Sequence, residues 1–286
     1  MLSVALALAR AVYFGAAMLL FGSLALRLLM RAHLPHIRQL TIAELQIAAG
    51  AAALIAAPLW FVLAAGQMAG DARAAFNGTV LIQSLQTLFG TGFLVRMAAL
   101  ALMGILLAFR SDPPALAMAG LALASPALSS HAAASSPAHF TAIGIAVDAV
   151  HLLTAGFWIG GLALLAVAFA RKMAQADLLL SLGLFSEWAM VAVLLLTMTG
   201  VINTALVLLG QPGHTAPLYL GVLGIKLTCV AAMLTLASVN RFRLMPRFTV
   251  GDTGVRLRRN VAWELSLGIA VVALGGLLGQ LAPTLG

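Results

Sequence analysis

Residues 139–170 read HFTAIGIAVDAVHLLTAGFWIGGLALLAVAFA, and this stretch decides the fold of the chain. A helix needs about 20 predominantly apolar residues to cross a bilayer, so the apolar run from residue 141 to residue 170 predicts a membrane-spanning helix. The run contains an acid, Asp148, and an imidazole, His151. Ionisable side chains at membrane depth are costly and indicate a functional site. Because these two stand three positions apart, they share one helix face.

The composition of the whole chain is that of an integral membrane protein. Of 286 residues, 63% are hydrophobic and 8% are charged, and the mean hydropathy is +1.08, which leaves too little polar surface to cover a soluble globule. The apolar runs are too long for barrel strands of about 10 residues. We therefore predict an all-α, polytopic helical bundle of about eight transmembrane helices, forming one integral membrane domain over residues 1–286. The helices are expected near residues 3–27, 42–66, 88–109, 114–133, 141–170, 182–209, 217–239 and 259–282.

The basic residues predict the orientation of the bundle. When the loops are taken alternately, twelve of the 16 Lys and Arg residues fall in one set and one falls in the other. The first set comprises Arg27, Arg31, Arg38, Arg110, Arg171, Lys172, Arg241, Arg243, Arg247, Arg256, Arg258 and Arg259, and the second holds Arg73. By the positive-inside rule the first set is cytoplasmic, so both termini face outward. The net charge of +8 is then a topology signal, and no nucleic-acid partner is expected.

Two further features of the chain have simple interpretations. The first predicted helix begins directly at Met1 without a small-residue cleavage pattern behind it, so we expect it to be retained. Cys229 is the only cysteine and cannot form an internal disulfide; we interpret it as a buried, inert thiol.

The central run resembles a known family. The segments DAVHLL (148–153) and FWIGGL (157–162) are similar to the central helix of the CopD family of bacterial copper resistance and copper uptake proteins. Further matches are Phe185-Ser186, Thr199-Gly200 with Asn203, Tyr219-Leu220-Gly221 with Lys226, Asn240-Arg241 before Pro246, and Glu264 before Pro283, whereas the first four helices match mainly in hydropathy and in Ser130-His131-Ala132. The resemblance implies a protein of the bacterial inner membrane that acts on copper, usually beside a small periplasmic copper-binding protein. With the orientation predicted from the basic residues, it is a multi-pass protein with both termini periplasmic.

Four residues near the outer end of the central helix are candidate copper ligands: His131, His139, Asp148 and His151. Imidazole and carboxylate suit Cu(II), while His and Met suit Cu(I), so the oxidation state stays open. The alternative is that the first two are solvated loop residues and that His151 is satisfied by Asp148 or by a carbonyl of a neighbouring helix. His214, in a Pro/Gly loop, is a weaker candidate.

Other polar side chains inside the predicted helices separate by depth. Those in the outer half are Arg96, Asn203 and Lys226, and those near the inner ends are Glu44, Glu187 and Glu264. Two interpretations remain open. Arg96 or Lys226 pairs with Asp148 and neutralises a buried charge, while the acids reach the interface; or the acids are the inner acceptors of a cation path.

The function that these features favour is copper binding on the periplasmic side with movement of copper toward the cytoplasm. The membrane potential supplies about 2.3 kcal/mol per charge per 100 mV for cation entry. We expect no enzyme activity, because the chain has no phosphate loop, nucleophile elbow or zinc-protease motif. The alternative is a haem-binding membrane cytochrome, which would require a second axial histidine at matching depth.

Overall fold

The computed structural model describes residues 2–31, 33, 43–130, 141–209, 214–248, 252–282 and 284–285. Its α-helices are α1 (Leu2–Arg31), α2 (Ala43–Met68), α3 (Gly78–Leu85), α4 (Leu88–Ala108), α5 (Asp112–Ala124), α7 (Thr141–Ala170), α8 (Gln175–Leu209), α9 (Pro217–Val239) and α10 (Thr253–Leu278). Short 3-10 helices are η2 (Ala72–Phe76), η3 (Ser125–Ser129) and η6 (Met245–Arg247), and η5 (Asn240–Leu244) is a π-helix. Two-residue strands β1 (His214–Thr215) and β2 (Thr284–Leu285) pair antiparallel.

The prediction of an all-helical membrane bundle is confirmed. Within the described residues, seven helices are long and apolar enough to cross a membrane: α1, α2, α4, α7, α8, α9 and α10. The remaining predicted span, near 114–133, is not a single membrane-spanning helix. It consists of the 13-residue helix α5 followed by η3, and its last three positions lie outside the described residues. Pro126, in the first turn of η3, lacks the backbone N–H that would continue α5.

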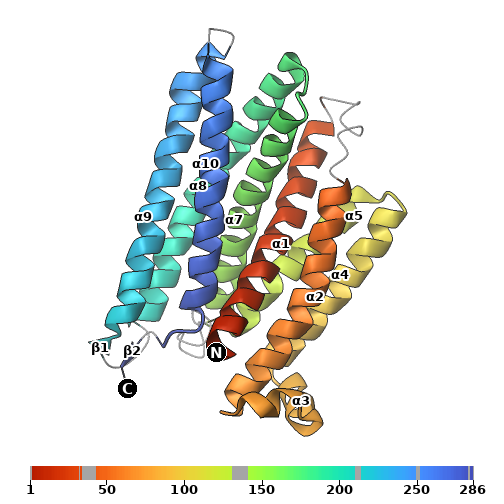
Figure 1. Ribbon diagram of the computed structural model, residues 1–286, viewed down its shortest axis with the longest axis vertical. Coiled ribbons are helices and arrows are strands. Elements are labelled where there is room, and N and C mark those ends of the chain that lie inside the picture. The colour runs from red at the N-terminus through yellow and green to blue at the C-terminus, as the bar shows by residue number, and fades with distance from the viewer. Residues whose placement is uncertain are drawn as a thin grey trace.

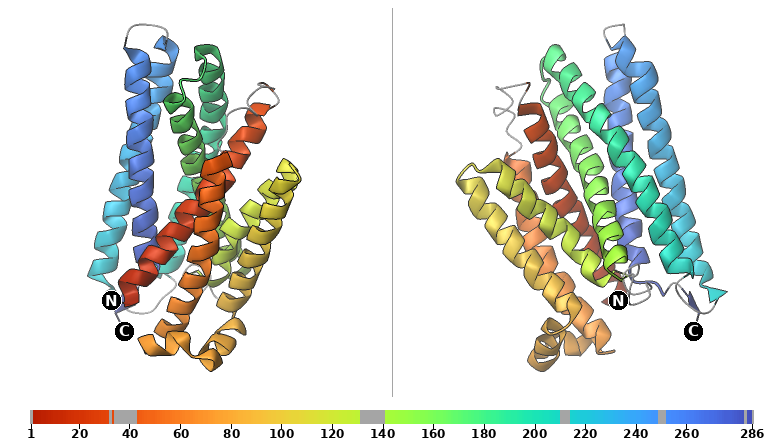
Figure 2. Two further views of the ribbon diagram at one scale, coloured as in Figure 1. Left: turned by 45° about the vertical axis from the view of Figure 1, so that its right-hand side comes forward. Right: turned by 180° about the vertical axis from the view of Figure 1, so that it is seen from behind.

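The helices form two groups that meet at α1 and α7 (Figure 1). One core gathers apolar side chains of α1, α2, α4 and α5, and a second gathers those of α7, α8 and α10 with the end of α1. The views turned by 45° and by 180° keep this division, with α8 and α9 on the outside of the second group (Figure 2). The candidate site therefore lies on α7 at the junction of the two groups.

A close crossing of α1 and α7 depends on glycine. A Cβ at Gly22 would meet the carbonyl oxygen of Gly156 and lie 2.7 Å from the Cα of Gly160. Gly156 and Gly160 are four residues apart on one face of α7, which is the small-xxx-small spacing that lets membrane helices approach closely. The next residue, Gly161, packs against the ring of Phe185 on α8. The FWIGG part of the family resemblance is thus a packing motif.

The two chain termini lie at the same end of the bundle (Figure 1). The helix ends that carry most of the basic residues lie together at the opposite end: the C-terminal ends of α1, α4, α7 and α9, and the N-terminal end of α10. There Asp112 ties α5 to α1 through Arg27 at 2.8 Å and Arg31 at 3.1 Å. The charge asymmetry predicted from sequence is therefore an asymmetry between the two ends of one bundle.

Candidate metal site

Asp148 and His151 lie on α7 toward the end of the bundle that holds the termini. At 1.5 Å per residue they are about 10 Å and 15 Å along the helix from its first residue, Thr141. Both are half-buried and both contact α8, where Asn203 and Thr199 are their hydrogen-bond partners. The helical spacing placed the two side chains on one face, and the packing of α8 supplies a polar partner for each.

The tautomer of His151 is assigned from its neighbours. Its Nδ1 lies 3.1 Å from Oγ1 of Thr199, and the proton of that hydroxyl is engaged by the carbonyl oxygen of Leu195 at 2.7 Å. We therefore assign a hydrogen to Nδ1, which donates to the hydroxyl, and the lone pair to Nε2. The ring also forms a hydrogen bond with the backbone of Leu196. It packs against Gly200 of α8, where a Cβ would lie 3.4 Å from Cε1, an ordinary contact distance.

Asp148 is surrounded by amide, hydroxyl and cationic groups. Its Oδ1 accepts a hydrogen bond of 3.1 Å from Nδ2 of Asn203, and its side chain also bonds Ser130. Lys226 of α9 and Arg10 of α1 interact with it electrostatically, but neither forms an ion pair with it among the described residues. Asp148 is thus a carboxylate held by hydrogen bonds between two more distant cations.

Arg96 is buried against aromatic rings, and its Nη1 and Nη2 atoms have no hydrogen-bond partner among the described residues. Its guanidinium lies 4.2 Å from the ring centroid of Trp60 and 4.9 Å from that of Tyr13, and Nε donates to Ser125 Oγ at 3.2 Å. It forms no ion pair with Asp148. The residue is 0% exposed, so no space for a ligand adjoins it. The arrangement is a buried cation–π packing contact.

A second polar cluster surrounds Glu264 of α10, deeper in the bundle and toward its basic end. Glu264 is 2% exposed and accepts hydrogen bonds from the side chains of Asn240 and Trp158. Asn260 in turn donates to Oδ1 of Asn240 at 2.8 Å. Asn240 begins the π-helix η5, a distortion that is frequent at functional sites. Glu187, considered with Glu264 in the sequence, is exposed on α8 and is no part of this cluster.

The other predicted ligands cannot be located. His131 and His139 lie outside the described residues, and only the backbone of His214 is described, in β1. Within the described part of the chain, no group of three or more His, Cys, Asp or Glu side chains could hold a metal ion. The described site therefore contributes two candidate ligands, Asp148 and His151.

Sequence reasoning missed the residues that hold these groups. Thr199, Trp158 and Asn260 were not considered as partners, although Thr199 and Trp158 occur in the motifs that carry the family resemblance. Their partners are 48, 106 and 20 residues away, so no local spacing could reveal the pairing.

Comparison with known proteins identifies the family. The model for the N-terminal domain of copper resistance protein D-like proteins matches residues 1–140, and the model for copper resistance protein D matches residues 179–278. Copper resistance protein D of Pseudomonas syringae pv. tomato is 30% identical over 223 residues, which cover 69% of this chain and 70% of that protein. The chain belongs to the copper resistance protein D family.

A second relative of this CopD-family protein is copper transport protein CutJ of Bacillus subtilis (strain 168), 28% identical over 135 residues. The match covers 46% of this chain but only 24% of that protein. No solved structure matches the chain significantly. Asp148 and His151 lie between the two regions that the family models match, whereas Thr199, Asn203 and Glu264 lie inside the second.

Proposed function

We propose that this CopD-family membrane protein binds copper at Asp148 and His151 and passes it toward the cytoplasm, contributing to copper homeostasis and resistance. One observation carries the proposal: Nδ1 of His151 lies 3.1 Å from Oγ1 of Thr199, whose proton is engaged by Leu195. We therefore assign a free electron pair to Nε2, on the helix face that His151 shares with Asp148. Neutral imidazole with its second nitrogen held by a hydrogen bond is the usual form of a histidine ligand. Copper is the cargo in this scheme, in either oxidation state.

The remaining ligands would come from the segment that precedes α7. The side chain of Ser130 bonds Asp148, and His131 is the next residue in the chain. We propose that His131 and His139 complete the coordination, since imidazole suits both oxidation states of copper. In this arrangement Asn203 and Thr199 position the ligands without binding the metal.

Direction follows from orientation and charge. We assign the end with both termini to the periplasm and the basic end to the cytoplasm of the bacterial inner membrane. A small periplasmic copper-binding protein would deliver the ion to the first end. Glu264 then provides an oxygen ligand nearer the cytoplasmic end, which a dehydrated cation needs in hydrocarbon. The membrane potential favours inward movement by about 2.3 kcal/mol per charge per 100 mV.

The test is the copper content of the purified protein. Protein in lipid nanodiscs is loaded with Cu(I) under reductant or with Cu(II), dialysed, and analysed for copper by elemental analysis. We expect copper to be retained by the wild type and lost in His151→Ala and Asp148→Asn. His33→Ala is the control, since His33 is exposed beyond the basic end of α1. Equal retention in all four proteins contradicts the site.

The absorption spectrum of the same samples tests the haem alternative. Of the six histidines, His151 is the one that lies within a membrane-spanning helix of the described chain, whereas bis-histidine ligation needs two at matching depth. We therefore expect no Soret band. A Soret band that disappears in His151→Ala would replace the copper proposal by a cytochrome.

A further inference from the structure

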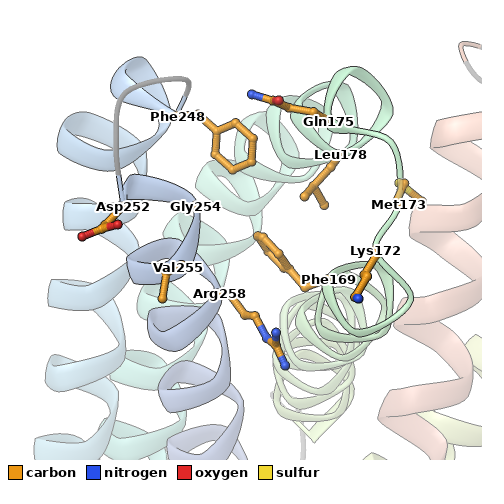
Figure 3. A pocket seen from close by; sticks show the side chains of 10 residues that line it. All are labelled: Phe169, Lys172, Met173, Gln175, Leu178, Phe248, Asp252, Gly254, Val255 and Arg258. Atoms are coloured by element: carbon orange, nitrogen blue, oxygen red, sulfur yellow. The ribbon is translucent and has the colours of Figure 1, made fainter.

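A pocket of about 490 Å³ opens at the basic end of the bundle, between the end of α7, the start of α8, η6 and the start of α10 (Figure 3). The pocket is open rather than enclosed. It is separate from the cluster around His151, which lies toward the other end of α7. Neither the family resemblance nor the proposed copper path uses it.

The lining of the pocket combines apolar and cationic groups. Phe169, Leu178 and Phe248 form an apolar wall, and the side chains of Lys172 and Arg258 enter from α7 and α10 (Figure 3). Neither cation has a hydrogen bond or ion pair with a residue that the structure describes. The carboxylate of Asp252 points away from the space between them (Figure 3). The pocket therefore offers two free positive charges beside an apolar surface.

Helix α7 ends beside the pocket in a left-handed turn at Lys172. Helix α7 ends with hydrogen bonds from Met173 N–H to Ala168 O at 3.1 Å and from Lys172 N–H to Phe169 O at 3.2 Å. This is the Schellman arrangement, in which glycine is the usual residue at the left-handed position. Lys172 has φ of 52° there, and this turn places it at the rim of the pocket.

We propose that the pocket binds the phosphate of an anionic phospholipid, such as phosphatidylglycerol, from the leaflet at the basic end of the bundle. Basic pockets between helices on the cytoplasmic side recognise lipid headgroups in this way. Lys172 and Arg258 contact the phosphate, and Phe169, Leu178 and Phe248 contact the start of an acyl chain. The apolar wall favours a lipid over free inorganic phosphate, which needs only the two charges.

The chain offers a matched control for the test. Helix α4 ends in the same hydrogen-bond pattern, with Arg110 at φ of 57°, and Arg110 does not line the pocket. Arg256, exposed on α10, does not line it either. We therefore compare two double variants that each remove two positive charges from the basic end of the bundle. The pocket pair is Lys172→Gly/Arg258→Gln, and the control pair is Arg110→Gly/Arg256→Gln. Both should fold, because glycine adopts positive φ readily.

Binding of phosphatidylglycerol is measured by native mass spectrometry of protein in detergent micelles, titrated with phosphatidylglycerol or with phosphatidylcholine. At about 1 kcal/mol for each cation, the pocket double variant should bind phosphatidylglycerol roughly 30-fold more weakly than the wild type. The control pair should lose less than about threefold, because neither Arg110 nor Arg256 lines the pocket. Equal losses in the two pairs, or no loss in the pocket pair, overturn the proposal.

Competition with inorganic phosphate tests whether the pocket binds the phosphate of a lipid or a free phosphate ion. We expect millimolar inorganic phosphate to leave phosphatidylglycerol bound. We also expect Phe248→Ala to weaken lipid binding while Arg110→Gly does not. If inorganic phosphate displaces the lipid and Phe248→Ala has no effect, the pocket is a site for small anions and the lipid proposal is wrong.

Discussion

Replacing Thr199 by valine should weaken copper binding without altering the ligands. Valine keeps the shape of threonine but removes the hydroxyl that accepts the Nδ1–H of His151 at 3.1 Å. The ring then keeps the backbone of Leu196 as its hydrogen-bond partner but loses the hydroxyl. Loss of one hydrogen bond costs about 0.5–1.5 kcal/mol, so we expect the dissociation constant for copper to rise roughly 2- to 13-fold. The upper end of this range meets the 10–100-fold effects typical of groups that orient metal ligands.

The measurement is competition for copper between the protein in nanodiscs and a chromophoric chelator. Thr197→Val is the matched control: Thr197 Oγ1 donates to Val193 O at 2.8 Å, as Thr199 does to Leu195 O, but it is exposed and does not contact His151. Thr199→Ser, which retains the hydroxyl, should bind like the wild type. The reasoning is refuted if Thr199→Val binds copper as tightly as Thr197→Val, or if the serine variant is as weak as the valine variant.

Three further outcomes are expected. Gly160→Ala places a Cβ 2.7 Å from the Cα of Gly22, so α1 and α7 must separate. We expect a loss of about 1–3 kcal/mol of stability, measured as a lower unfolding temperature. The control Gly221→Ala has nothing within 4 Å of its new Cβ and should not destabilise the protein. Glu264→Gln should reduce cytoplasmic copper accumulation while His151 still binds the ion, and the exposed Glu187→Gln should match the wild type; equal uptake in both variants would argue against an inner ligand. Tags at both termini should be labelled in right-side-out vesicles and the loop between α9 and α10 protected, and labelling of either terminus only after permeabilisation would reverse the orientation.

The helices were largely predictable because, in a bilayer, the formation of each spanning helix depends mainly on its own sequence. With no water in the hydrocarbon core, each crossing segment must satisfy its own backbone hydrogen bonds, so length and apolarity are sufficient. The runs predicted at 141–170 and 217–239 coincide with α7 and α9. The segment at 114–133 was less predictable, because hydropathy does not register the proline that ends α5. Helix α3 was missed because its eight residues are too few to cross a membrane.

The sequence by itself determined that this protein is a membrane-spanning helical bundle and that Asp148 and His151 share one face of a helix, because both properties depend on neighbours within a few residues. The tertiary structure decided what those side chains meet. It set Thr199 and Asn203 against them, placed Arg96 between aromatic rings, and enclosed Glu264 with Asn240. Such partners come from helices distant in sequence, and between apolar helices their meeting depends on side-chain shape and close glycine contacts, which no periodicity in the sequence records.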